Sequence, residues 1–121
     1  MNYSKAGTGS TVKLEDYSKE IIFDQHVLPG KGHLLQIVTI PAHTKQRSHY
    51  HDHQTEVFLI LEGECSIFIN NEEFQAMPGD AFVCSPGDKH NLWNKSDKEF
   101  KLAVFKIDLP DVKDTHWSEN N

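Results

Sequence analysis

Short apolar segments that end at turn-forming residues constrain the fold of this chain most strongly. Each segment is five to ten residues long, is rich in Val, Ile, Leu and Phe, and stops at a Gly, Pro or Asn. These residues supply a turn or remove a donor from a strand ladder. The pattern predicts an all-β fold, a sandwich or small barrel. The predicted strands are residues 33–40, 56–62, 65–69, 80–84 and 100–109.

The length of 121 residues fits one domain, which we place at residues 14–110. Within it, residues 14–23 (LEDYSKEIIF) have the composition of one or two helical turns. Residues 1–13 and 111–121 are polar, so they cannot bury enough apolar surface to offset the entropy of ordering. We expect flexible tails at both ends.

Composition excludes several classes of function. The formal net charge is -6, and the 12 Lys and Arg residues are spread along the chain, so nucleic acid is not an expected partner. No leader pattern is present, and no apolar run approaches the roughly 18 residues of a membrane span. We expect a cytoplasmic protein with no membrane partner. Cys65 and Cys84 lie within apolar segments, which favours buried thiols without chemistry.

The segment EVFLILE, residues 56–62, is apolar on both faces of an extended strand. If Glu56 faces the interior, Phe58 and Ile60 share its face, whereas Val57 and Leu59 point outward. The outer face needs a cover, which is either the N-terminal segment or a second subunit. Of these two covers, we predict the second subunit, in a homodimer.

Histidines at alternate positions open the most informative stretch, SHYHDHQTEVFLILEGE, residues 48–64. On a strand, His49, His51 and His53 would all project to one face. Their spacing alone therefore leaves open which of them bind a metal together with Glu56.

The stretch continues a longer pattern. His49-x-His51 is followed by four residues, Glu56, six residues and Gly63, and a second pattern, with His90 inside it, runs from Gly79 to Asn94. Together they resemble the two cupin signature motifs, G(x)5HxH(x)3-4E(x)6G and G(x)5PxG(x)2H(x)3N. The sequence departs from them at two turn positions, where His43 replaces a glycine and Ser85 a proline.

The resemblance implies a cupin-type β-barrel, also called a jelly roll or double-stranded β-helix. It also implies that His49, His51, Glu56 and His90 are metal ligands. His53 departs from the family spacing and is expected in the loop between two strands.

The chemistry of these donors agrees with the resemblance. Imidazole and carboxylate suit a single divalent ion of Fe, Mn, Ni, Co, Cu or Zn. Three neutral nitrogens and one carboxylate leave such a site net positive, so it attracts anionic or chelating oxygen ligands. Four ligands around an octahedral ion leave two positions for water, substrate or dioxygen.

Arg47 lies two residues before His49, and on a regular strand it would point into the barrel beside the ligands. There it would serve as a catalytic-site anchor for an anionic small molecule, whereas at an irregular strand end it would reach solvent.

Three functions remain open. The first is a metal-dependent isomerase or epimerase acting on a sugar, sugar phosphate or related hydroxy-carbonyl compound. The second is an Fe(II) dioxygenase, and the third is a non-catalytic metal- or ligand-binding module.

Overall fold

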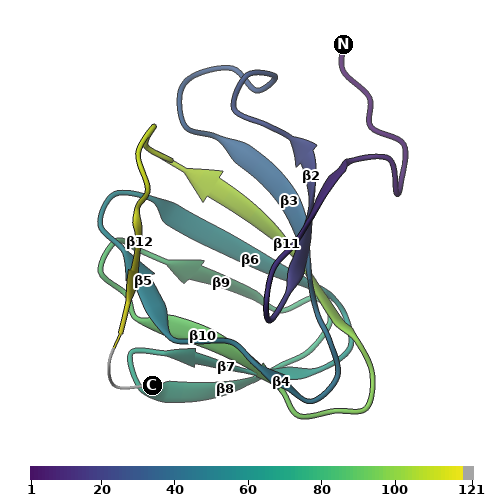
Figure 1. Ribbon diagram of the computed structural model, residues 1–121, viewed down its shortest axis with the longest axis vertical. Coiled ribbons are helices and arrows are strands. Elements are labelled where there is room, and N and C mark those ends of the chain that lie inside the picture. The colour runs from purple at the N-terminus through teal and green to yellow at the C-terminus, as the bar shows by residue number, and fades with distance from the viewer. Residues whose placement is uncertain (119–121) are drawn as a thin grey trace.

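Two antiparallel sheets face each other in the computed structural model, which describes residues 1–118 (Figure 1). The first sheet has the order β1 (Ser10–Lys13), β2 (Ser18–Phe23), β3 (Leu34–Ile40), β11 (Phe100–Ile107), β6 (Thr55–Glu62) and β9 (Ala81–Cys84). The second has the order β12 (Thr115–Trp117), β5 (His49–His51), β10 (His90–Asn94), β7 (Cys65–Ile69) and β8 (Glu72–Ala76), with β4 (Thr44–Lys45) paired to β10. The predicted all-β fold is confirmed.

The five predicted strands correspond to β3, β6, β7, β9 and β11. The helical turn predicted at residues 14–23 is wrong, because Ser18–Phe23 form strand β2, which pairs with both β1 and β3. Backbone hydrogen bonding to β3 makes this segment a strand. The composition of the segment itself does not show that a strand edge is available for pairing. Residues 1–118 include no helix with the length and apolar character that a membrane span needs.

The segments predicted as tails differ from that prediction. Ser10–Lys13 extend the first sheet as β1, and Thr115–Trp117 extend the second as β12, which pairs with β5. Asp114 and Ser118 beside β12 are 4% and 5% exposed. A polar segment can join a sheet edge through its backbone alone, so composition does not predict this pairing. Residues 119–121 of the predicted C-terminal tail lie outside the described residues.

The core lies between the inner faces of the two sheets. Along β6, Glu56, Phe58 and Ile60 are buried, whereas Leu59 and Leu61 on the outer face are each 45% exposed. This confirms that the strand is apolar on both sides. The inner face of β6 therefore carries a carboxylate into an otherwise apolar layer.

Residues of the two sequence motifs shape the turns around this layer. His43 has a φ of 53°, the left-handed conformation that favours glycine, so it adopts the backbone shape expected there. Gly63 has a φ of 83°, and an added Cβ would lie 2.8 Å from the Glu99 carbonyl oxygen. The fully buried Asn94 donates from Nδ2 to the carbonyls of Ile40, Pro41 and Lys98.

We expect Cys65 and Cys84 to be unreactive in the folded protein. Both are buried, and burial raises the pKa of each thiol to about 12, so almost no thiolate exists near neutral pH. A thiol-reactive dye at pH 8 should label neither cysteine until guanidinium chloride unfolds the chain. Rapid labelling of the native protein would contradict the burial of these residues.

Candidate metal centre

Side chains from three strands meet on the inner side of the fold. β5 supplies His49 and His51, β6 supplies Glu56 and β10 supplies His90. The Nε2 atoms of His51 and His90 lie 2.8 and 3.1 Å from Glu56 Oε1. One donor atom from each of the four residues lies within 4.8 Å of all the others. The four side chains predicted as ligands are therefore brought together.

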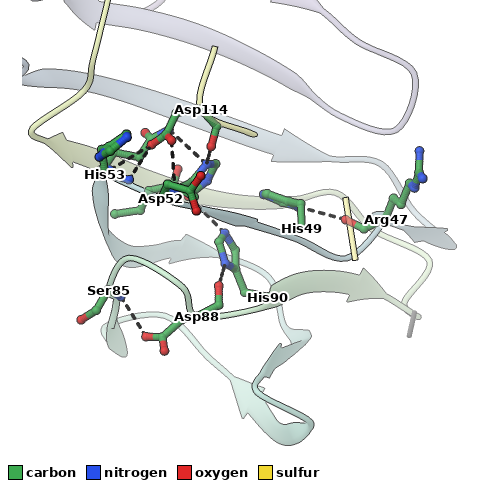
Figure 2. Close-up of polar contacts among 11 residues, drawn as sticks. Arg47, His49, Asp52, His53, Ser85, Asp88, His90 and Asp114 are labelled. Carbon is green, nitrogen blue, oxygen red and sulfur yellow. Dashed lines mark hydrogen bonds and ion pairs between the residues drawn. The ribbon is translucent and has the colours of Figure 1, made fainter. Parts of the chain in front are cut away.

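Main-chain carbonyls orient all three imidazoles (Figure 2). Each ring bonds a carbonyl through Nδ1, which leaves Nε2 for the cluster. Metal-binding histidines in proteins usually have such a partner on the second nitrogen, because it fixes the ring and the tautomer. The donor set thus fits a divalent transition metal ion. The Nδ1 contacts are His49 to Arg47 O at 3.0 Å, His51 to Asp114 O at 3.1 Å and His90 to Asp88 O at 2.9 Å.

The cluster is electrostatically suited to a cation. Burial by itself would raise the pKa of Glu56, but hydrogen bonds from His51 and His90 hold that pKa well below its usual value. Burial, followed by repulsion from His90, lowers the pKa of His49 to about 4. Near neutral pH, Glu56 is therefore ionised and His49 is neutral, which are the forms that bind metal. Burial by itself would lower the pKa of His51, but its hydrogen bond to Glu56 and the charge of that carboxylate together outweigh burial and raise that pKa, so a metal ion would compete with a proton at His51.

Asp114 secures the turn between β5 and β6. Its carboxylate accepts hydrogen bonds from the backbone N–H groups of Asp52, His53 and Gln54, each at 3.0 Å (Figure 2). Its own carbonyl accepts the bond from His51 Nδ1. One residue outside the family motifs therefore holds both the turn and a candidate ligand.

The cluster opens into a pocket with a volume of about 90 Å³. One wall is apolar, and Trp117 of β12 and Asp16 also line the space. The other polar groups come from strands β3, β11 and β12 and from the residues just before β2 and β5. They are Tyr17, Gln36, Gln46, Lys106 and Thr115.

His53 and Arg47 lie outside the cluster. His53 is exposed in the turn between β5 and β6, as the motif spacing predicted. Arg47 does not point into the barrel: it is exposed, and its guanidinium lies 4.5 Å from the Trp117 ring centre, away from the histidines (Figure 2). The regular strand begins only at His49, so the alternation does not extend back to Arg47, and Gln46 lines the pocket instead.

Sequence reasoning missed Lys106 and Gln36, although a signal was available. Along β11, Phe100, Leu102 and Val104 are buried inward residues, and Lys106 continues their alternation. Gln36 continues the corresponding series along β3. A polar residue at an inward-facing position of a strand, among buried apolar residues, indicates a functional site. In contrast, nothing in the sequence links Asp114 to His51.

A family model described as the cupin domain matches residues 36–106, more than half of the chain. The chain belongs to the cupin family. This confirms the cupin-type barrel, and solved structures agree. A predicted oxalate decarboxylase from Thermotoga maritima superimposes with a TM-score of 0.81 at 16% identity, covering 89% of this chain and 100% of the other. The polyketide cyclase RemF from Streptomyces resistomycificus gives 0.79 at 15% identity, covering 98% and 88%. At these identities the likeness shows the fold alone.

Curated proteins also match parts of this chain in sequence. An oxidoreductase of Arthrobotrys oligospora is 33% identical over 64 residues, 52% of this chain, but the match spans only 25% of that protein. An uncharacterised protein of Methanocaldococcus jannaschii is 24% identical over 94 residues, 78% of this chain and 75% of its own. Neither assigns a reaction to this cupin.

Removing a candidate ligand should abolish tight metal binding. We expect His51→Ala and Glu56→Gln to weaken the affinity for Zn²⁺ or Mn²⁺ by more than about 100-fold, beyond the 10- to 100-fold typical of outer-shell changes. Metal content after purification without chelators, together with calorimetric titration, measures this. His53→Ala is the matched control and should bind metal like the parent. Loss of metal in the His53 variant would show that the assignment of ligands is wrong.

Asp114→Ala should destabilise the fold, because it leaves three backbone N–H groups of the turn between β5 and β6 without their acceptor. We expect the free energy of unfolding to fall by roughly 2–4 kcal/mol, and metal affinity to fall with it. Asp114→Asn retains one acceptor oxygen and should be intermediate. Urea denaturation measures the effect, and Asp111→Ala, an exposed neighbour, should change little.

Proposed function

We propose that this cupin is a metal-dependent enzyme of the isomerase or epimerase type, acting on a small hydroxy-carbonyl compound such as a sugar or sugar derivative. The observation that carries the proposal is that all four candidate ligands line one pocket. An ion held by them would keep coordination positions facing that pocket. A divalent metal there would polarise a carbonyl group and acidify the neighbouring C–H bond.

The residues of the chain supply what such a reaction needs beyond the ion. Tyr17 lines the pocket, and burial, followed by repulsion from Asp16 and Glu56, raises the pKa of its phenol. The phenol therefore stays protonated and can donate a hydrogen bond to a substrate oxygen. Lys106 adds a cationic group on the same inner face. The apolar wall limits the water around the reacting carbon.

A dioxygenase is the second candidate, since one curated relative, matched over 25% of its own length, carries the name oxidoreductase. The same donors accept Fe(II), and the same open positions would accept dioxygen. The two reactions differ in their dependence on redox: the isomerase needs only a Lewis acid, whereas the dioxygenase needs an ion that changes oxidation state. A non-catalytic binding module would need neither.

We also propose that the protein is a homodimer. Leu59 and Leu61 on β6 are each 45% exposed, and Val83 on the neighbouring strand β9 is 58% exposed. These residues form an apolar patch on the outer face of the first sheet. A second subunit would remove it from water in an interface of about 1,600 Å² or more.

Proton exchange tests the reaction. Protein loaded with Zn²⁺ or Mn²⁺ should exchange deuterium from deuterated water into the carbon next to the carbonyl of its substrate, read by NMR across sugars, sugar phosphates and hydroxy acids. The metal-free protein and Glu56→Gln should not. Oxygen consumption by the Fe(II) form without such exchange would favour the dioxygenase. Binding of such a compound without proton exchange or oxygen consumption would favour a non-catalytic binding module.

Sedimentation tests the assembly. At micromolar concentration the parent should sediment as a dimer, and Leu59→Glu should sediment as a monomer because it places a charge in the patch. Val112→Glu changes an apolar residue that is 70% exposed elsewhere, and it should remain dimeric. A monomeric parent would rule out the homodimer at this concentration.

A further inference from the structure

Lys106 carries a positive charge to the inner face of the barrel. It continues the series of inward-facing residues along β11. In the register of the sheet, its backbone lies opposite that of Glu56 on the adjacent strand β6. Its charge lies near the candidate ligands, because Lys106 and Glu56 are paired across β11 and β6 and both line the pocket. The lysine therefore lies next to the metal centre without belonging to it.

No residue of the described chain bonds the side chain of this lysine directly. Among residues 1–118, Lys106 forms no ion pair or hydrogen bond through its side chain, and the Glu56 carboxylate is engaged by His51 and His90. Burial, followed by repulsion from Lys106, lowers the pKa of Lys19, so a second cation adds to the positive potential. With a divalent ion bound, the charges of the ion and Lys106 outweigh those of Glu56 and Asp16, the two carboxylates that line the pocket.

Within the described chain, two buried amide side chains also lack a hydrogen-bond partner for their oxygen atom. Gln36 is 4% exposed and Gln46 is 9% exposed, and both line the pocket. The Oε1 atom of each is buried without a hydrogen-bond partner among residues 1–118. Because buried polar groups nearly always have partners, these oxygens are candidates to accept a hydrogen bond from a hydroxyl group of a ligand.

We propose that the pocket binds a small 2-hydroxy- or 2-oxo-carboxylate, and that Lys106 is the residue that selects its carboxylate. The amides of Gln36 and Gln46 would bond a hydroxyl group of the same molecule. This inference rests on the proposed function and narrows its substrate class. Arg47, the anion anchor predicted from the sequence, is exposed and stacked on Trp117, so Lys106 takes that role.

The features of the pocket favour a carboxylate over a phosphate. The volume of about 90 Å³ is several times the roughly 10–15 Å³ that one water needs, which suits a small molecule. Phosphate sites commonly use a helix N-terminus, a backbone nest or a bidentate arginine. The residues that line this pocket come from strands and their connections and include no arginine.

Calorimetry on the metal-loaded protein tests the inference with glycolate, lactate and glycerate, and with glycolamide and lactamide as neutral analogues. Lys106→Gln should weaken binding of the carboxylates about 10- to 100-fold, the loss expected for one charge-assisted contact. The affinity for glycolamide and lactamide should stay unchanged. Lys106→Arg should retain most of the affinity. Lys101→Gln, on the outer face of the same strand, should bind like the parent.

Metal affinity separates this role from a structural one. Lys106→Gln removes a charge that repels the ion, so it should bind Zn²⁺ at least as tightly as the parent, whereas a misfolded variant would lose metal. Equal binding of glycolate by parent and variant would overturn the inference, as would tight binding only of inorganic phosphate or sugar phosphates. Lys106-dependent carboxylate binding without proton exchange would support the inference and contradict only the proposed reaction.

Discussion

A buried, ionised carboxylate organises this protein. Glu56 is 7% exposed inside an apolar layer, where an unpaired charge would cost several kcal/mol. Hydrogen bonds from His51 and His90 compensate for that burial, and they come from two strands of the opposite sheet. The same carboxylate is what a divalent cation requires. The compensation of one charge therefore fixes both the packing of the two sheets and the position of the candidate metal centre.

Backbone carbonyls also position the three imidazoles, each through the Nδ1 atom of the ring. Two of these carbonyls belong to Arg47 and Asp88, close in sequence to the ring they hold, but the third belongs to Asp114, 63 residues from His51. Gly87 also donates to the His51 carbonyl at 2.7 Å, which ties the second motif to the first. The shape of the site thus depends on backbone that the ligand positions do not reveal.

The pocket combines polar and apolar groups, and this combination links the fold to a class of ligand. The four candidate ligands and Lys106 line it together with apolar side chains. Such an arrangement suits a small molecule with oxygen atoms at more than one position. Because the motifs supply only the candidate ligands, we expect specificity in this chain to lie in the pocket residues that the motifs omit.

The sequence by itself determined the strands that have alternating or continuous apolar character, and it determined the four candidate ligands, because motif spacing distinguishes His51 from His53. The alternation of apolar residues in the sequence also indicated that Lys106 and Gln36 face inward. Tertiary structure alone decided that Ser18–Phe23 is a strand, that Thr115–Trp117 joins β5 and that Arg47 faces outward. The physical reason is the same in each case: backbone pairing at a sheet edge, and the point where a regular strand begins, depend on partners distant in the sequence and leave no local pattern in side-chain composition.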